Sequence, residues 1–116
     1  INRTVVQKKC LKMSWEKIMR DKKEEYKYSI ILTGKFKKHL KNLKKQKKDL
    51  KLLENIISIL AKGEKLPPKN KDHKLVNNYD GARECHITPD WLLIYEIVED
   101  KLILILLASG SHSELF

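Results

Sequence analysis

The spacing of apolar residues changes once along this chain, and the change limits which elements each half can form. Between residues 35 and 62 they recur every three or four positions, as in amphipathic helices. Residues 83–108 instead contain three short apolar and β-branched runs separated by turn residues, as in strands. The sequence therefore predicts an α+β fold. Its 116 residues have room for one domain with one hydrophobic core.

The first half of the domain is predicted to form one strand and a helical hairpin. Residues 26–32 alternate and end in apolar and β-branched residues, which favours a strand, and Thr33 follows as a helix cap. Helices are predicted over about 35–48 and 49–62, with Gly63 ending the second. The first of them has an apolar seam and a cationic outer face.

Two adjacent prolines, Pro67 and Pro68, mark the transition to the second half, because proline cannot continue a helix. A surface loop is expected from there to His73. Short connections favour antiparallel pairing of three strands, predicted at Arg83–Ile87, Leu92–Val98 and Leu102–Ala108. The continuous apolar run 102–107 predicts a central strand buried on both faces, followed by a C-terminal tail.

The formal net charge of +10 is the strongest feature of the composition, since such a field attracts phosphate backbones, acidic proteins or anionic membranes. Residues 1–51 hold 18 Lys and Arg against 5 Asp and Glu, and residues 52–116 hold 7 against 10. Nine lysines lie between residues 35 and 51, more than solubility alone requires. We expect this helix to contact RNA, with a merely solvated face as the alternative, through Lys37, Lys38, Lys41, Lys44 and Lys45.

The cysteines and the N-terminal region indicate a reducing cytoplasm. Cys10 and Cys85 are too few for a disulfide framework, and neither belongs to a Cys-x-x-Cys motif. No apolar run approaches the roughly 18 residues of a membrane helix, and no export signal is visible. Residues 1–25 are expected to be an extension of uncertain origin, with apolar residues spaced for one amphipathic helix, preceding a domain at 26–116.

Histidines are the natural proton carriers near neutral pH, and three of them come from different segments. His73, His86 and His112 are expected in a loop, a strand and the tail. RNA cleavage without a metal needs such a convergent set, although each alone also fits a surface or core histidine. His39, in the lysine-rich helix, fits solvated surface or a phosphate contact better.

A zinc site is the main competitor, because imidazole and carboxylate both bind metal. His86 and Asp90 are four residues apart, but Pro89 excludes a helix that would place them on one face. Since no two possible ligands have the spacing of a structural zinc motif, we expect neither metal nor cofactor.

Several rare residues in the last third occur in a distinctive order: Asp72-His73-x-Leu75, Gly81-x-Arg83-x-x-His86-x-x-Pro89-Asp90-Trp91-x-Leu93-Ile94-Tyr95, and Gly110-x-His112 with Phe116. This pattern resembles that of YafQ-type toxins of the RelE superfamily. The resemblance covers about residues 26–116 and is densest between Asp72 and Tyr95. Two departures are residues 1–25 and Ala82, where the family often has a bulkier aromatic.

The resemblance implies a RelE-like fold and a metal-independent endoribonuclease, an mRNA interferase, that cuts mRNA in the ribosomal A site. The 2′-hydroxyl would be the nucleophile, and a cognate antitoxin would neutralise the toxin. By residue, it implies acid–base exchange mainly by His86 and His112, in roles left open, with His73 and Asp90 positioning groups and Phe116 stacking on a base.

Four neighbouring residues admit two interpretations each. Arg83 fits a contact to the scissile phosphate or a buried salt bridge. Trp91 and Tyr95 fit the core as well as the site, and Cys85 fits a small buried residue better than a nucleophile.

Two other functions remain open at this point. A non-catalytic toxin of the superfamily, resembling ParE-type proteins that act on gyrase, is disfavoured by the three histidines. A basic RNA-binding module without catalysis predicts that substituting His86 or His112 leaves toxicity intact.

Overall fold

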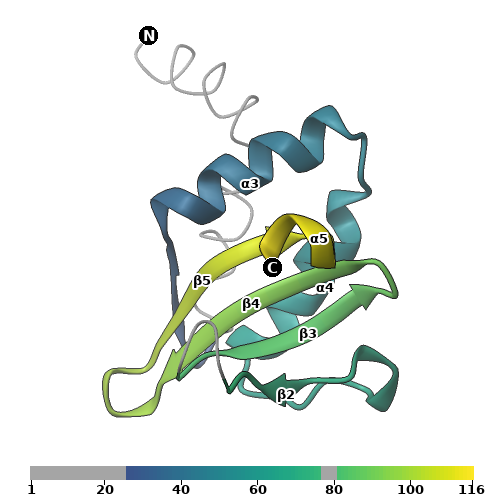
Figure 1. Ribbon diagram of the computed structural model, residues 1–116. Helices are drawn as coiled ribbons and strands as arrows, with labels where there is room; N and C mark the ends of the chain where they lie inside the picture. Colours follow the sequence, from purple (N-terminus) through teal and green to yellow (C-terminus); the bar gives the residue numbers. More distant parts are fainter. Residues whose placement is uncertain (1–25, 77–80) are drawn as a thin grey trace, which may run out of the picture.

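A computed structural model describes residues 26–76 and 81–116, which form a five-stranded sheet with helices on both faces (Figure 1). The α+β class and the helical hairpin are confirmed, while the predicted helix in residues 1–25 lies outside the described residues. The elements, labelled as in Figure 1, are β1 (Ser29–Leu32), α3 (Gly34–Lys45), α4 (Leu50–Ala61), η2 (Pro68–Asn70), β2 (His73–Lys74), β3 (Arg83–Thr88), β4 (Trp91–Val98), η3 (Glu99–Lys101), β5 (Ile103–Gly110) and α5 (His112–Leu115).

The sheet is mixed, in the order β1-β5-β4-β3-β2. Strands β3, β4 and β5 are antiparallel, as predicted, but β1 pairs in parallel with β5, from Ser29 opposite Ile103 to Leu32 opposite Leu106. The fifth strand, β2, forms where a loop was expected, because its two residues pair with the start of β3.

Helix ends follow the capping pattern of the sequence. The Thr33 hydroxyl accepts a hydrogen bond from the Phe36 N–H at 3.1 Å and begins α3. The Asp49 carboxylate accepts from the Lys51 N–H at 3.0 Å and begins α4. Gly63 follows α4 with φ of +80°, a conformation that glycine adopts without strain. Among the described residues, no helix has the length and apolar character needed to cross a bilayer.

The two faces of the sheet carry separate apolar clusters. On one face, Trp91, Leu93 and Tyr95 of β4 pack with the seams of α3 and α4. On the other face, Leu92 and Ile94 pack with a smaller cluster that includes Ala82, just before β3, Ala108 of β5 and Leu115 of α5. Helix α5 is therefore held on the face opposite the helical hairpin (Figure 1).

The prediction that residues 102–107 are buried on both faces was wrong. Leu104 and Leu106 are fully buried on the side of the helical hairpin, but the alternating side chains of Ile103, Ile105 and Leu107 are only half-buried. Among the described residues, the helix on the other face of the sheet is α5, which spans only four residues and does not cover β5 along its whole length. Leu102 precedes the strand and is 46% exposed.

Candidate active site

The register of the sheet brings His73 and His86 to the same face. His73 on β2 lies opposite Glu84 on β3, and opposed residues of an antiparallel pair project to one side. His86 follows Glu84 by two positions and so shares that side. Ala82, two positions before Glu84, belongs to the smaller apolar cluster, which identifies this as the face that carries α5.

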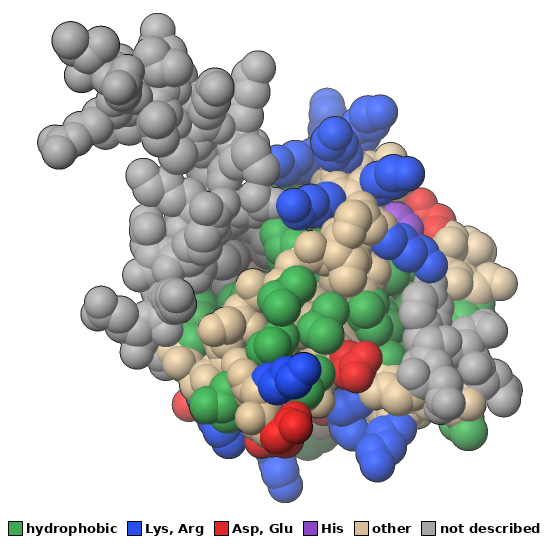
Figure 2. All heavy atoms as spheres, turned by 90° about the vertical axis from the view of Figure 1, so that its left-hand side faces the viewer, with side chains coloured by type: hydrophobic (Ala, Val, Ile, Leu, Met, Phe, Trp, Pro, Cys, Tyr) green, Lys and Arg blue, Asp and Glu red, His purple; other side chains and the backbone are tan. Residues whose placement is uncertain are grey.

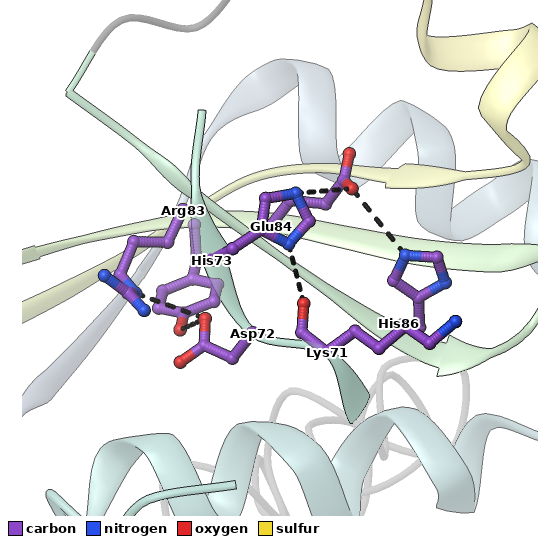
Figure 3. Close-up of polar contacts among 7 residues, drawn as sticks. Lys71, Asp72, His73, Arg83, Glu84 and His86 are labelled. Carbon is purple, nitrogen blue, oxygen red and sulfur yellow. Dashed lines mark hydrogen bonds and ion pairs between the residues drawn. The ribbon is translucent and has the colours of Figure 1, made fainter. Parts of the chain in front are cut away.

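A buried carboxylate joins these two histidines. The Oε1 atom of Glu84 lies 3.3 Å from His73 Nε2 and 3.8 Å from His86 Nε2, and Glu84 is only 6% exposed (Figure 3). The His73 Nδ1 atom lies 2.7 Å from the Lys71 carbonyl oxygen. Both nitrogens of His73 therefore face oxygen acceptors, an arrangement that two N–H donors of an imidazolium satisfy.

Glu84 was not predicted as a site residue. A carboxylate inside a strand is costly to bury unless it is paired, so its position was itself a signal. It also precedes His86 by two residues, which places the two side chains on one face of any regular strand. The partner on β2 could not be inferred, because β2 was expected to be a loop.

The backbone around His86 is fixed by a buried asparagine. Asn70 is 3% exposed, and its Nδ2 donates a hydrogen bond of 2.7 Å to the His86 carbonyl oxygen. This bond ties the η2 segment to β3. The His86 imidazole itself is 25% exposed, so it can reach a bound substrate while its main chain is held.

The strand register also relates the position of His86 to that of α5. His86 lies opposite Leu92 of β4, and Leu92 lies opposite Gly110 of β5. Two strand spacings separate His86 from Gly110, about 10 Å between their backbones. His112 follows Gly110 by two residues and begins α5.

The tail predicted at residues 112–116 is a short capped helix. The Ser111 hydroxyl accepts from the Glu114 N–H at 3.3 Å, and Glu114 Oε1 accepts from the Ser111 N–H at 2.8 Å. This reciprocal capping box stabilises a helix that would otherwise be too short. The exposed rings of His112 and Phe116 lie with their centroids 5.0 Å apart, so both side chains are available on the open face.

Asp90 lies in the turn between β3 and β4, where its side chain is exposed. The turn is at the end of the sheet where β5 leads into α5, as the register of Leu92 with Gly110 shows. The carboxylate that contacts two histidines is nevertheless Glu84 and not Asp90.

Arg83 lies apart from the histidines. Its Nε atom is 3.2 Å from Asp72 Oδ1, and the Tyr95 hydroxyl donates to the same oxygen at 2.5 Å (Figure 3). The hydrogen bond with Asp72 raises the pKa of Arg83, and burial followed by the Asp72 bond raises that of Tyr95. Strand alternation also places Arg83 on the face opposite Glu84. The salt-bridge interpretation is the one observed, and a phosphate contact stays a prediction.

Three ambiguous residues belong to the core. Trp91 and Tyr95 are 2% and 1% exposed, and the Trp91 Nε1–H donates to the Ser109 hydroxyl at 3.0 Å. Cys85 is fully buried, and burial raises the pKa of its thiol. A thiol that stays protonated is a poor nucleophile, which agrees with the predicted structural role.

His39 is not the solvated side chain that we predicted. It is half-buried, and its Nδ1 atom accepts a hydrogen bond of 3.1 Å from the Ser109 N–H. Burial, and then the nearby charge of Lys35, lower the pKa of His39. The residue therefore connects α3 to the end of β5 as a neutral imidazole.

The lysine-rich face of α3 is solvent-exposed, and positively charged side chains gather at the top of the molecule in Figure 2. Apolar side chains lie below them on the same face of the molecule. RNA binding by the five predicted lysines, Lys37, Lys38, Lys41, Lys44 and Lys45, stays a prediction. Within residues 26–76 and 81–116, no three His, Cys, Asp or Glu side chains are grouped so that they would hold a metal ion.

Sequence comparison places this chain beside one group of proteins. The profile of a family described as bacterial toxin of type II toxin-antitoxin system, YafQ, matches residues 28–116. The mRNA interferase toxin YafQ of Escherichia coli strain B / BL21-DE3 is 38% identical over 88 residues, which cover 75% of this chain and 94% of that protein. The corresponding protein of strain K12 is 36% identical over 88 residues, with the same coverage.

Solved structures agree with this similarity. The crystal structure of YafQ from E. coli BL21(DE3) has a TM-score of 0.72 at 32% identity and covers 77% of this chain and 98% of that one. A metal-bound toxin from Helicobacter pylori has a TM-score of 0.73 at 46% identity, covering 77% and 99%. The E. coli DinJ-YafQ toxin-antitoxin complex has a TM-score of 0.71 at 32% identity, covering 78% and 98%.

Proposed function

Because this chain belongs to the YafQ family of bacterial type II toxin-antitoxin toxins, we propose that it is an mRNA interferase that cuts ribosome-bound message in the A site. The observation that carries the proposal is the buried Glu84 carboxylate between His73 and His86, on the face that also holds His112. Two imidazoles that share a carboxylate, with a third at the start of α5, are the kind of proton-carrying groups that RNA cleavage without a metal needs.

The reaction proposed is an internal transesterification. The 2′-oxygen forms a bond to the phosphorus while the bond to the 5′-oxygen breaks, which leaves a 2′,3′-cyclic phosphate and a 5′-hydroxyl. One group must take the 2′-hydroxyl proton and another must protonate the leaving oxygen. His86 and His112 are proposed to exchange these two protons, from β3 and α5, and no metal ion takes part.

The remaining residues are proposed to orient these two. Glu84 is proposed to fix the imidazoles of His73 and His86 through its Oε1 atom, and His73 to position groups and tune the charge near the phosphate. Asp90, which is exposed in the turn between β3 and β4, is proposed to order a polar group of the substrate. Phe116 stacks on a base.

Two macromolecular partners follow from the family and the charge. The lysines of α3 are proposed to contact ribosomal RNA, with an affinity that falls steeply with salt. The YafQ toxin of E. coli is found in complex with the antitoxin DinJ. We propose that a separately encoded antitoxin likewise neutralises this chain.

The test is to map mRNA 5′ ends on translating ribosomes with the wild-type protein and with His86→Ala and His112→Ala. No metal is added beyond ribosomal magnesium, and Asn55→Ala, at an exposed position of α4, is the control. In-frame cuts that need ribosomes, persist in the control and vanish in both histidine variants would support the proposal. An absence of wild-type cuts at toxic doses would refute it.

A basic RNA-binding module without catalysis is the second candidate, since the lysine face alone would supply it. It predicts that His86→Ala and His112→Ala remain as toxic as the wild type. Growth assays of the two variants distinguish the candidates.

A further inference from the structure

A cavity outside the histidine cluster lies between α3, the end of β5 and α5. Its volume is about 220 Å³, and it is lined by His39, Asn42, Leu43, Gln46, Ser109 and Glu114. That volume equals roughly seven water molecules at about 30 Å³ each. It suits one flat heterocyclic ring and not a larger ligand.

The cavity is adjacent to the residues proposed to act on RNA. Glu114 is two residues from both His112 and Phe116, within the same short helix. The Gln46 Nε2 donates to Glu114 Oε2 at 3.0 Å, which joins α3 to α5 across the cavity. A polynucleotide that crosses His112 therefore passes the opening, beside the exposed lysines of α3.

The polar groups of the lining define what the cavity would bind. Backbone and side-chain hydrogen bonds from Ser111 and Gln46 lower the pKa of Glu114, so the carboxylate is ionised and only accepts. Each of its oxygens accepts one bond and has capacity for another. Gln46 keeps its carbonyl oxygen as a second acceptor, while Leu43, 1% exposed, supplies an apolar wall.

Two side chains of the lining, His39 and Asn42, supply donors beside these acceptors. The Nδ1 atom of His39 accepts from the Ser109 N–H, so the neutral ring carries its proton on Nε2. Asn42 adds an amide that both donates and accepts. An edge with an amino group beside an acceptor matches this set, as when carboxylates read cytosine N4 and amides read adenine. Uracil offers a single N3–H between two carbonyl oxygens, and the oxygen at the position of the cytosine amino group would oppose the carboxylate.

We propose that this cavity binds one base of the RNA substrate and selects bases with an exocyclic amino group, adenine, cytosine or guanine, over uracil. The inference rests on the proposed function for its biological meaning. Binding itself requires no cleavage.

NMR titration of a cleavage-deficient variant with single nucleotides tests the proposal. The side-chain amide resonances of Asn42 and Gln46 are followed in His86→Ala protein as the 5′-monophosphates of adenosine, cytidine, guanosine and uridine are added. We expect at least one of the amino-bearing nucleotides to shift them with an affinity about tenfold higher than that of uridine monophosphate. Adding Asn42→Ala should weaken this binding about fivefold, as followed at Gln46, whereas adding Asn55→Ala should not.

The outcomes separate this proposal from the cleavage proposal. Equal shifts with uridine monophosphate, no shifts with any nucleotide, or unchanged binding in the Asn42→Ala protein would each overturn the base site. If the nucleotides bind selectively but the wild-type protein does not cut mRNA, the base site is supported and the cleavage proposal is refuted.

Discussion

Replacing Ser109 with alanine should destabilise the domain strongly, although only one oxygen is lost. Ser109 is 2% exposed, and its hydroxyl accepts from the Trp91 Nε1–H at 3.0 Å and donates to the Leu92 carbonyl at 2.8 Å. Alanine removes the hydroxyl oxygen that accepts this bond and leaves the indole N–H of Trp91 without its protein acceptor. An orphaned buried donor costs about 1–3 kcal/mol.

The effect can be expressed as a melting temperature. Taking about 2 kcal/mol, and about 4–8 °C per kcal/mol for a domain of this size, Ser109→Ala should melt roughly 8–16 °C below the wild type. Thermal and urea unfolding followed by circular dichroism measure both the midpoint and the slope. The urea slope should not change, because the exposed surface is the same. Ser29→Ala, at an exposed serine of β1, should stay within about 0.5 kcal/mol.

A double-mutant cycle distinguishes the lost hydrogen bond from a general defect. In a Trp91→Phe background no indole N–H is present, so Ser109→Ala should cost less than half as much as it does alone. If Ser109→Ala is as mild as Ser29→Ala, or costs the same in both backgrounds, the assignment of the Trp91–Ser109 bond as a stabilising contact is refuted.

Three further predictions concern the site and the basic helix. Glu84→Gln should reduce mRNA cleavage about ten- to hundredfold without unfolding, since acid–base groups contribute about 10²–10⁴ and Glu84 acts through two of them; an unchanged rate would exclude its role. The lowered pKa of His39 means that stability is full above about pH 6.5 and falls as the pH drops through the folded value. His39→Asn keeps an acceptor for the Ser109 N–H but cannot titrate. Its free energy of unfolding in urea should therefore differ less between about pH 7.5 and about pH 5.5 than that of the wild type, and an equal difference would contradict this. Replacing both Lys38 and Lys41 with alanine should reduce the salt dependence of single-stranded RNA binding by about 1.4 in log–log slope, and an unchanged slope would place RNA elsewhere.

The helical hairpin could be predicted because its signals are local. The cap at Thr33, the apolar seam of α3 and the glycine at position 63 all act within a few residues. The three antiparallel strands could also be predicted, because apolar runs alternate with turn residues in that part of the sequence. The parallel pairing of β1 with β5 was not, because it joins residues 74 positions apart.

Residue types identified some members of the candidate site, but the contacts among them depend on segments that are far apart in the sequence. Three histidines were proposed from residue type, but which carboxylate contacts His73 and His86 depends on the pairing of β2 with β3. That pairing selects Glu84 and directs Arg83 to Asp72 on the other side. His39 was assigned to solvent because the sequence does not show that α3 packs against the end of β5.

The parallel pairing of β1 with β5 determines when the sheet can form during translation. Residue 29 must wait for residue 103 before its strand can pair, and ribosomes add about 5–20 residues per second. For roughly 4–15 s the β1 segment of the nascent chain has no strand to pair with. Helix α5, which contains His112, is synthesised after β5. The sheet and the candidate site on it are therefore complete only several seconds after β1 has been made.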